Sequence, residues 1–345
     1  MRLVMTLLAR DEADVVDAQL AYHLAAGVDF VVATDNRSRD GTTEVLERYA
    51  QEGRLHLIRE EGDDLRQSEW VTRMARLAAT DFGADWVLNA DADEFWWPQA
   101  ASLKEILEAV PARFGVVRGA WRNFVPRPGG GFFAERMTVR FCRPTFEDHP
   151  LGTHFKSVHR AAPDVRVGRG NHEAFAPGLH PLRGWYPIEI LHFPVRSLEQ
   201  CLRKYVTQFE ALERNREKGI PAHMAEAYRA WRAGRLEEFY APLVVDDAAL
   251  ARGLADGTFE VDTRLRDVLR ALGFGARESE SAAPARGRPS PEEAARFAGE
   301  ISVLWDADPG LHYAERVADL EARVGRLERS LLGRARAALA AGRRR

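Results

Sequence analysis

The chain has 345 residues, of which 46% are hydrophobic and 29% charged, a composition typical of globular proteins that excludes a chain disordered throughout. Its formal net charge of −3 gives no global basic field, so nucleic acid is not an expected partner. No run approaches the roughly 18 apolar residues of a membrane span, and the first apolar stretch ends in charge rather than in a signal-peptide cleavage site, so we expect a cytoplasmic protein.

Strand and helix patterns alternate through the first hundred residues. The elements they predict are strands over 2–9, 28–35, 54–60 and 84–95, and helices over 14–26, 42–51 and 66–82. This alternation indicates βαβ units on a largely parallel sheet, and in such sheets ligands bind beyond the carboxyl ends of the strands. We therefore expect an α/β fold with its site at that edge.

Polar side chains follow three of these predicted strands. They are Arg10, Asp11 and Glu12 after the first strand, Asp35 and Asn36 after the second, and Asp91, Asp93 and Glu94 after the fourth. A parallel sheet brings all three groups to one edge, which predicts a polar crevice there. The alternative is that they are ordinary loop residues.

The segment "DADE" (91–94) places three carboxylates within four residues, where they repel one another unless a cation joins them. Carboxylate oxygens suit Mg²⁺ or Mn²⁺, which commonly complete their coordination with phosphates, so the segment favours a phosphorylated substrate. A solvated acidic turn is the alternative. The apolar run before the segment and the pair Trp96 and Trp97 after it favour a buried site instead.

Three segments together carry a family resemblance. "LLARDE", "ATDNRSRDGT" and "DWVLNADADEF", each at the end of a predicted strand, resemble the nucleotide-sugar half of glycosyltransferase family 2 in its "DxDEF" form. The resemblance covers residues 1–100. It implies a GT-A fold, meaning a Rossmann-like mixed sheet flanked by helices, and a nucleotide diphosphate sugar as donor with Mn²⁺ or Mg²⁺ as cofactor.

The resemblance also implies roles for individual residues. These are nucleobase contact for Asp35, the lining of the nucleotide pocket for Ala9, Arg10 and Glu12, ribose or metal contact for Asp91, and metal coordination for Asp93. The first loop reads "ARDE" where many relatives have Asn before the Glu, which is a departure from the pattern. Arg73 in the third predicted helix is a candidate partner for the acids or a phosphate, with a solvated helix charge as the alternative.

Mixed strands and loops follow from residue 114, and we expect them to extend the sheet and to form the acceptor side. His192 ends the run "IEIL" and begins a His-x-x-x-Arg-Ser segment similar to one in the same family, which implies a third metal ligand. Packing alone is the alternative for this residue. The family inverts the anomeric centre, which implies a base for the acceptor hydroxyl. Glu173 is the first candidate and Asp148 the second, and both have the alternative of being loop acids.

The last third of the sequence predicts a helical C-terminal extension. A helix over 197–218 begins at the N-cap candidate Ser197, and 276–294 has the composition of a flexible linker. Beyond it, apolar residues at heptad spacing predict a C-terminal helix that pairs into a homodimer through 311–335, with contact to an anionic membrane surface or packing on the domain as alternatives. The predicted organisation is a GT-A domain over 1–195 (donor half 1–100, acceptor half 101–195), an extension over 196–275, a linker over 276–294 and a final helix over 295–345.

We therefore predict a glycosyltransferase of the hexosyltransferase type that uses a carbohydrate or other hydroxyl acceptor. Two alternatives belong to other classes. One is a catalytically silent nucleotide-sugar or carbohydrate-binding protein, and the other is a DxD phosphotransferase. The phosphotransferase would need a Thr shortly after its second acid, and "DADEFWW" has none. The two cysteines, Cys142 and Cys201, predict packed thiols in a reducing compartment.

Overall fold

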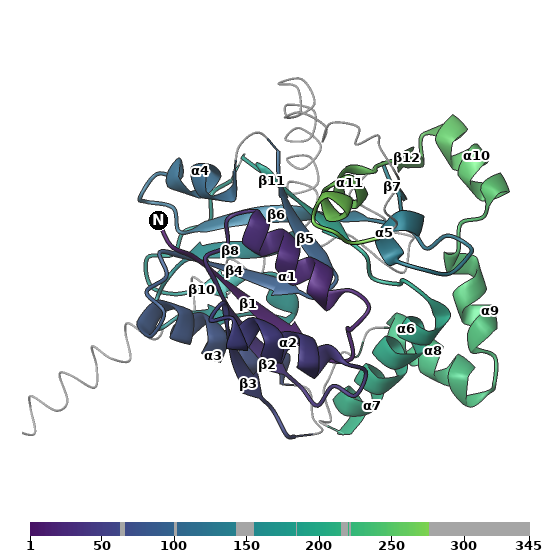
Figure 1. Cartoon of the computed structure of the whole chain (residues 1–345), viewed down its shortest axis with the longest axis horizontal. Helices are drawn as coiled ribbons and strands as arrows, with labels where there is room; N and C mark the ends of the chain where they lie inside the picture. Colours follow the sequence, from purple (N-terminus) through teal and green to yellow (C-terminus); the bar gives the residue numbers. More distant parts are fainter. Residues whose placement is uncertain are drawn as a thin grey trace, which may run out of the picture. The chain divides into compact units, whose positions relative to one another are not determined.

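An eight-stranded mixed sheet forms the centre of the protein (Figure 1). The computed structural model describes residues 1–62, 66–99, 102–142, 155–183, 185–214, 220 and 222–275, all within one unit of the chain. Four sequence-based predictions lie outside these residues: the second base candidate Asp148, the linker, the C-terminal helix and the dimer seam.

The strands of this sheet run in the spatial order β3-β2-β1-β4-β8-β6-β11-β5. Their bounds are β1 Leu3–Ala9, β2 Phe30–Asp35, β3 Leu55–Arg59, β4 Trp86–Asp91, β5 Glu94–Pro98, β6 Val116–Asn123, β8 Phe155–Arg160 and β11 Ile188–His192. The four strands from β3 to β4 are mutually parallel, and β8 is antiparallel to both of its neighbours. β11 is parallel to β6, and β5 closes the sheet antiparallel to β11. Six strands therefore end at one edge of the sheet, which is the edge where β5 and β8 begin.

Helices cover both faces of the sheet. The bounds of those in the first part of the chain are α1 Val16–Ala25, α2 Thr42–Gln51, α3 Gln67–Thr80, α4 Leu103–Glu108 and α5 Phe133–Arg136. Alternate residues of β1 divide between the two faces, as a strand period of two requires. Met5 packs in the same core cluster as Leu20 of α1 and Leu46 of α2, whereas Val4 packs with Met74 of α3. The predicted α/β fold, a mixed sheet flanked by helices, is confirmed.

The C-terminal extension is helical, as predicted. Its helices are α6 Leu198–Cys201, a π-helical segment Leu202–Val206, α7 Thr207–Arg214, α8 Ala222–Arg232, α9 Leu236–Tyr240, a 3₁₀ turn Ala241–Leu243, α10 Asp247–Asp256 and α11 Arg264–Ala271. The short strands are β7 Val139–Phe141, β9 Arg166–Val167, β10 Ala174–Phe175 and β12 Phe259–Val261, with a 3₁₀ turn at Arg169–Asn171. β12 pairs antiparallel with β7, so the extension is joined to the earlier part of the chain by backbone hydrogen bonds.

A buried cluster of five charged side chains reinforces this junction. Glu189 of β11 accepts from Arg122 and from Arg264, each at 2.8 Å. Asp262 accepts from Arg140 at 2.8 Å and also pairs with Arg264. Arg264 begins α11, so one guanidinium bridges an acid of the main sheet and an acid of the extension.

Two predicted elements differ from the structure. The run 84–95, predicted as one strand, divides into β4 and β5, which are separated by a turn at Ala92 and Asp93 and lie in different parts of the sheet. The helix predicted over 197–218 begins as expected, with the Ser197 side chain accepting from the Gln200 amide, but it is interrupted by the π-helical segment.

In the part of the chain that the structure describes, no helix combines the length and the apolar content needed to cross a bilayer. Neither cysteine is part of a disulfide; Cys201 is buried, as predicted for a packed thiol, whereas Cys142 is partly exposed.

Candidate functional site at the carboxyl edge of the sheet

The ends of three parallel strands bring the predicted donor-binding residues together. In the strand register Ala9 lies beside Asp35 on one side, and its neighbour Leu8 lies beside Asp91 on the other. His192 ends β11 beside Asn123, at the same edge. The predicted convergence of these strand ends is thus observed.

Asp35 is buried at the end of β2 and organises the turn that follows it. One carboxylate oxygen accepts from the Ser38 amide at 3.2 Å and from its hydroxyl at 2.6 Å, and the other accepts from the Thr43 hydroxyl at 2.6 Å. Arg10 donates to Asn36 at 3.1 Å across the same turn. Asp35 therefore supports this loop whether or not it also contacts a ligand.

These bonds decide how Asp35 should be tested. Asp35→Asn keeps one acceptor oxygen and gains a donor for Thr43, so we expect the melting temperature to change little. If Asp35 also binds the donor's nucleobase, the variant should bind the donor more weakly by about 1 to 3 kcal/mol, the range for losing one partner of a buried polar group. Titration calorimetry with nucleoside diphosphates measures this change.

The control for that variant is Asp40→Asn, because Asp40 supports the same loop through Thr42 and Ala13 without standing at a strand end. Equal losses of affinity in the two variants would assign Asp35 to loop support alone.

Glu12 of the first loop faces a buried guanidinium rather than open solvent. Its carboxylate pairs with Arg196, which also binds Asp14 through bonds of 2.7 and 2.8 Å. Burial raises the pKa of Glu12 to about 7, against the opposing effects of Arg196 and Lys204. Arg196 is fully buried, and it links the first loop to the chain segment that follows β11.

Asp91 and Glu94 share one lysine. The Nζ of Lys156, from β8, lies 2.5 Å from an Asp91 oxygen and 2.9 Å from a Glu94 oxygen. Asn171 donates to the other Asp91 oxygen at 2.9 Å, and the Trp121 indole donates to Glu94 at 2.7 Å. Burial raises the pKa of Glu94 to about 7 even with Lys156 beside it.

Asp93 is buried among three cationic or potentially cationic groups. Lys204 from the π-helical segment pairs directly with its Oδ2, while His192 Nε2 lies at 3.7 Å and Arg196 at 4.0 Å from the same oxygen. Burial alone would raise the pKa of Asp93, but the neighbouring positive charges, Lys204 above all, hold it well below its usual range. Asp93 is therefore ionised at neutral pH.

His192 is neutral and has a fixed tautomer. Its Nδ1 lies 2.7 Å from the carbonyl oxygen of the Asn123 side chain, which can only accept, so Nδ1 carries the proton. Burial lowers the pKa of His192 to about 4, and the ring stacks on Trp121 with centroids 4.0 Å apart. Its Nε2 thus turns an unprotonated lone pair toward Asp93, and two acceptors facing each other in this way suit a cation between them.

The cation near these acceptors in the structure is an ammonium group. The three predicted metal ligands Asp91, Asp93 and His192 are not gathered around one point, because Asp91 is bound by Lys156 and Asn171, and Asp93 by Lys204. Within the described ranges no group of three His, Cys, Asp or Glu side chains is arranged to hold a metal ion. The residues as they stand do not fit a divalent metal.

The remaining predicted residues lie in two places. Glu173 follows the loop of Asn171, is partly buried, and has a pKa raised by burial and lowered in part by Arg118. It is thus two residues from a side chain that binds Asp91. Arg73 is 44% exposed and pairs with Glu60, which directly follows β3 and whose amide donates to the Asp35 carbonyl at 2.9 Å.

Sequence reasoning missed the cations of the site, Lys156, Lys204 and Arg196, and the amide of Asn171. A signal for the lysines was present in the composition. Only four of the chain's 49 basic residues are Lys, the other two being Lys104 and Lys218, and two of the four lie in this cluster. Where Arg is the general choice for a surface cation, a Lys marks a position that needs a compact charge.

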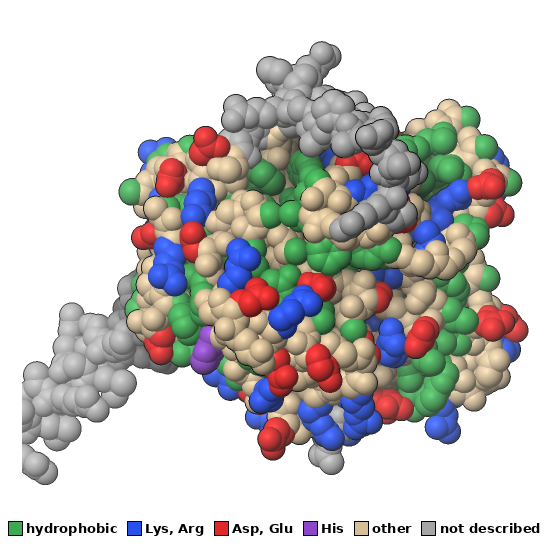
Figure 2. Space-filling view, viewed as in Figure 1, with side chains coloured by type: hydrophobic (Ala, Val, Ile, Leu, Met, Phe, Trp, Pro, Cys, Tyr) green, Lys and Arg blue, Asp and Glu red, His purple; other side chains and the backbone are tan. Residues whose placement is uncertain are grey.

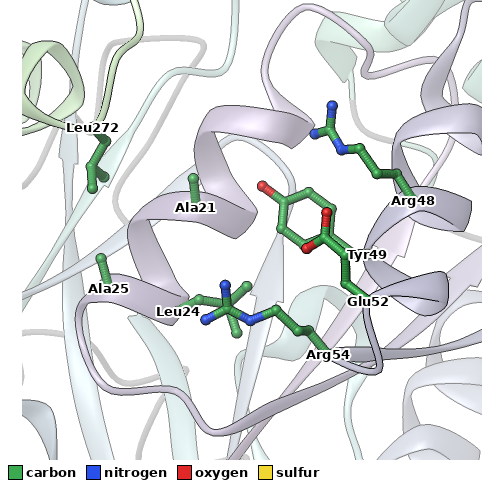
Figure 3. A pocket seen from close by; sticks show the side chains of 8 residues that line it. All are labelled: Ala21, Leu24, Ala25, Arg48, Tyr49, Glu52, Arg54 and Leu272. Atoms are coloured by element: carbon green, nitrogen blue, oxygen red, sulfur yellow. The ribbon is translucent and has the colours of Figure 1, made fainter.

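A separate surface hollow of about 350 Å³ lies between α1 and α2. Figure 3 shows Arg48, Tyr49 and Arg54 on its α2 side and the small side chains of α1 across from them. It is lined by the last turns of the two helices and by Arg54, which precedes β3, so it lies toward the edge where the parallel strands begin. The hollow is therefore distinct from the carboxylate cluster.

The face drawn in Figure 2 intersperses acidic and basic side chains.

Comparison with known proteins supplies an independent observation. Residues 15–161 match the family model described as glycosyl transferase family 2. TarS 1-349 of S. aureus in complex with UDP is 14% identical, with a TM-score of 0.33 over 81% of this chain and 94% of that one. In another TarS structure, with the same identity and TM-score, the match covers 68% of this chain and 43% of that one.

Glucosyl-3-phosphoglycerate synthase from Mycobacterium tuberculosis in complex with Mn²⁺, UDP and glucosyl-3-phosphoglycerate is 18% identical, with a TM-score of 0.24 over 37% of this chain and 45% of that one. A search of curated proteins gave no match. Since these TM-scores are below 0.5, the structural likeness adds no weight to the family match.

Proposed function

We propose that the chain is a glycosyltransferase family 2-like protein and that it moves a glycosyl group from a nucleotide diphosphate sugar to a hydroxyl of a carbohydrate or another acceptor. The observation that supports this proposal is the cluster of Asp91, Asp93 and His192 with its lysines, beside Asp35 at the carboxyl edge. A predicted nucleobase contact thus lies near charges suited to a diphosphate.

The chemistry of the transfer explains why such a cluster is needed. Negative charge develops on the departing diphosphate and positive charge on the anomeric carbon, so fixed cations near the phosphates stabilise the transition state. Lys156 pairs with Asp91 and Lys204 with Asp93, so both lysines lie at the acidic cluster. The acceptor hydroxyl must lose its proton, and a carboxylate with a raised pKa suits that step.

Glu173 is the carboxylate proposed for this role, because it is partly buried and lies close in sequence to Asn171, which binds Asp91. Inversion of the anomeric centre and dependence on Mn²⁺ or Mg²⁺ stay predictions from the family resemblance.

A donor screen tests the proposed function. UDP, GDP and dTDP and their sugars would each be added to the full chain, with and without Mn²⁺, while thermal stability is followed. We expect one nucleotide family to raise the melting temperature, because a ligand at 100 times its Kd stabilises the folded state by about 2.7 kcal/mol. The stabilising donor would then be assayed for sugar release or transfer. If no nucleotide diphosphate changes the melting temperature, the proposed function is wrong; if a donor binds and no sugar is released or transferred with any acceptor, the silent binding protein is the better interpretation.

A further inference from the structure

Lys204 reaches Asp93 because the helix that carries it changes its winding. Residues 198–201 are α-helical, 202–206 form a π-helical segment, and 207–214 return to the α form. A single π turn inside an α-helix shifts the direction of the side chains it carries and is frequent at functional sites. In this chain the turn places the Lys204 ammonium on the Asp93 carboxylate.

The ammonium of Lys204 keeps the capacity to bind a ligand. It has three N–H donors, of which the pairing with Asp93 uses one. The side chain is 17% exposed, whereas Asp93 is 3% exposed, so Lys204 lies on the outer side of the pair. The neighbouring Arg196 is only 1% exposed and is engaged by Glu12 and Asp14. Lys204 is thus the cation of this group best placed to meet an anion.

Lys156, unlike Lys204, is buried between two acids. It is 1% exposed and lies between Asp91 and Glu94, with its Nζ 5.2 Å from the centre of the Trp121 ring. Its charge is directed at the acids, so it offsets their repulsion of an incoming diphosphate. Asp91 itself is 26% exposed and remains accessible to a ligand hydroxyl.

We propose that Lys204 binds the diphosphate of the donor and that Lys204 and Lys156 together take the place of a divalent metal at the acidic cluster. This inference rests on the proposed function. Two ammonium groups carry the same charge as one Mn²⁺ and match the two negative charges of a nucleotide diphosphate sugar. The acids of "DADE" then serve to position the lysines, and a metal would have to displace Lys204 from Asp93.

Nucleoside diphosphate binding in the absence of metal tests this inference. Titration calorimetry of the full chain with UDP, GDP and dTDP would be done in EDTA and again with Mn²⁺. We expect the Kd of the preferred nucleotide to agree within about twofold between the two conditions. Lys204→Met should weaken it at least 10-fold, since charge-assisted hydrogen bonds contribute about 1.5 to 3 kcal/mol. Lys104→Met is the matched control, because Lys104 pairs with Asp29 at the surface and touches none of the site residues named here.

Removing Lys204 alone leaves the buried Asp93 without its closest partner, so a second variant guards against loss of folding. Lys204→Met combined with Asp93→Asn removes both charges of the pair and should also bind the nucleotide at least 10-fold more weakly.

Wild-type affinity in a folded double variant, or nucleotide binding that disappears in EDTA and returns with Mn²⁺, would overturn the inference and leave the proposed function standing. Failure of every nucleotide to bind in both conditions would instead refute the proposed function, and the inference with it.

Discussion

Glu173→Gln is expected to leave donor affinity unchanged and to lower the rate of transfer by about 10² to 10⁴, the range for loss of a general base. Gln has the same shape but cannot take a proton from the acceptor hydroxyl. The loop that carries Glu173 is held against the site by Asn171, which donates to Asp91 at 2.9 Å, so the substitution should not displace it. Single-turnover rates at saturating donor, measured together with the donor Kd, separate chemistry from binding.

The pH dependence gives this prediction a second readout. Burial raises the pKa of Glu173, with Arg118 opposing it, and the carboxylate form is the active one. The wild-type rate should therefore fall as the pH drops through that pKa, and Glu173→Gln should lose this acidic limb. Asp164→Asn, an exposed acid before β9, is the control and should keep the full rate and the limb. A near-normal rate in Glu173→Gln would move the role to Asp148 or to another residue.

The central sheet was predictable because its strands are continuous apolar runs between turn-forming residues. The predicted strand 28–35 is observed as Phe30–Asp35, and the helix 42–51 has the predicted bounds. Parallel strands then fix which residues share an edge, and for that reason the convergence of Ala9, Asp35 and Asp91 at one edge could be anticipated without a structure. Local pattern and sheet geometry together suffice for this part of the fold.

The partners of the acids could not be predicted in the same way. Lys204 and Asp93 are 111 residues apart, Asn171 and Asp91 are 80 apart, and Arg196 and Glu12 are 184 apart. No local periodicity connects such pairs, and the repulsion within "DADE" shows only that some cation is needed. A metal ion or a lysine could each supply the positive charge that offsets this repulsion, and the sequence does not distinguish between them.

The division of 84–95 into β4 and β5 could not be predicted for the same reason, because it depends on contacts with residues distant in the sequence. Both halves are apolar enough to continue one strand, so the pattern gives no break between them. The break falls where Asp93 turns toward Lys204 and Arg196, whose contacts come from a distant segment. Glu94 then starts β5 beside His192 of β11.

Glu189→Gln is expected to lower the free energy of unfolding at pH 7 by about 3 kcal/mol. Burial alone would raise the pKa of Glu189, but Arg264, Arg122 and Arg140 outweigh it and lower the pKa from 4.5 to about 2. At 1.36 kcal/mol per pKa unit, this difference corresponds to about 3 kcal/mol of stability at neutral pH, to order of magnitude. Urea unfolding followed by circular dichroism measures the change.

The sign of the pH dependence follows from the lowered pKa. The contribution of Glu189 is fully present above pH 4.5 and is lost as the pH falls toward 2, because the unfolded chain takes up the proton first. The gap between wild type and Glu189→Gln should therefore close across that window. Glu199→Gln is the matched control: Glu199 is 77% exposed and pairs with Arg203, and such surface pairs contribute about 0 to 1 kcal/mol.

Urea unfolding of Glu189→Gln also tests whether the stability of residues 196–275 depends on the main sheet. Arg264 joins Glu189 of β11 to Asp262 of the extension, so loss of the Glu189 charge leaves a buried guanidinium with one partner fewer at this junction. If the extension is stabilised by the sheet, Glu189→Gln should still unfold in one cooperative step at a lower urea concentration. Two separate transitions, with the first confined to the extension, would show that β12 and α11 form a unit that unfolds on its own. An unchanged midpoint at pH 7 would show that the cluster does not contribute to the free energy of unfolding.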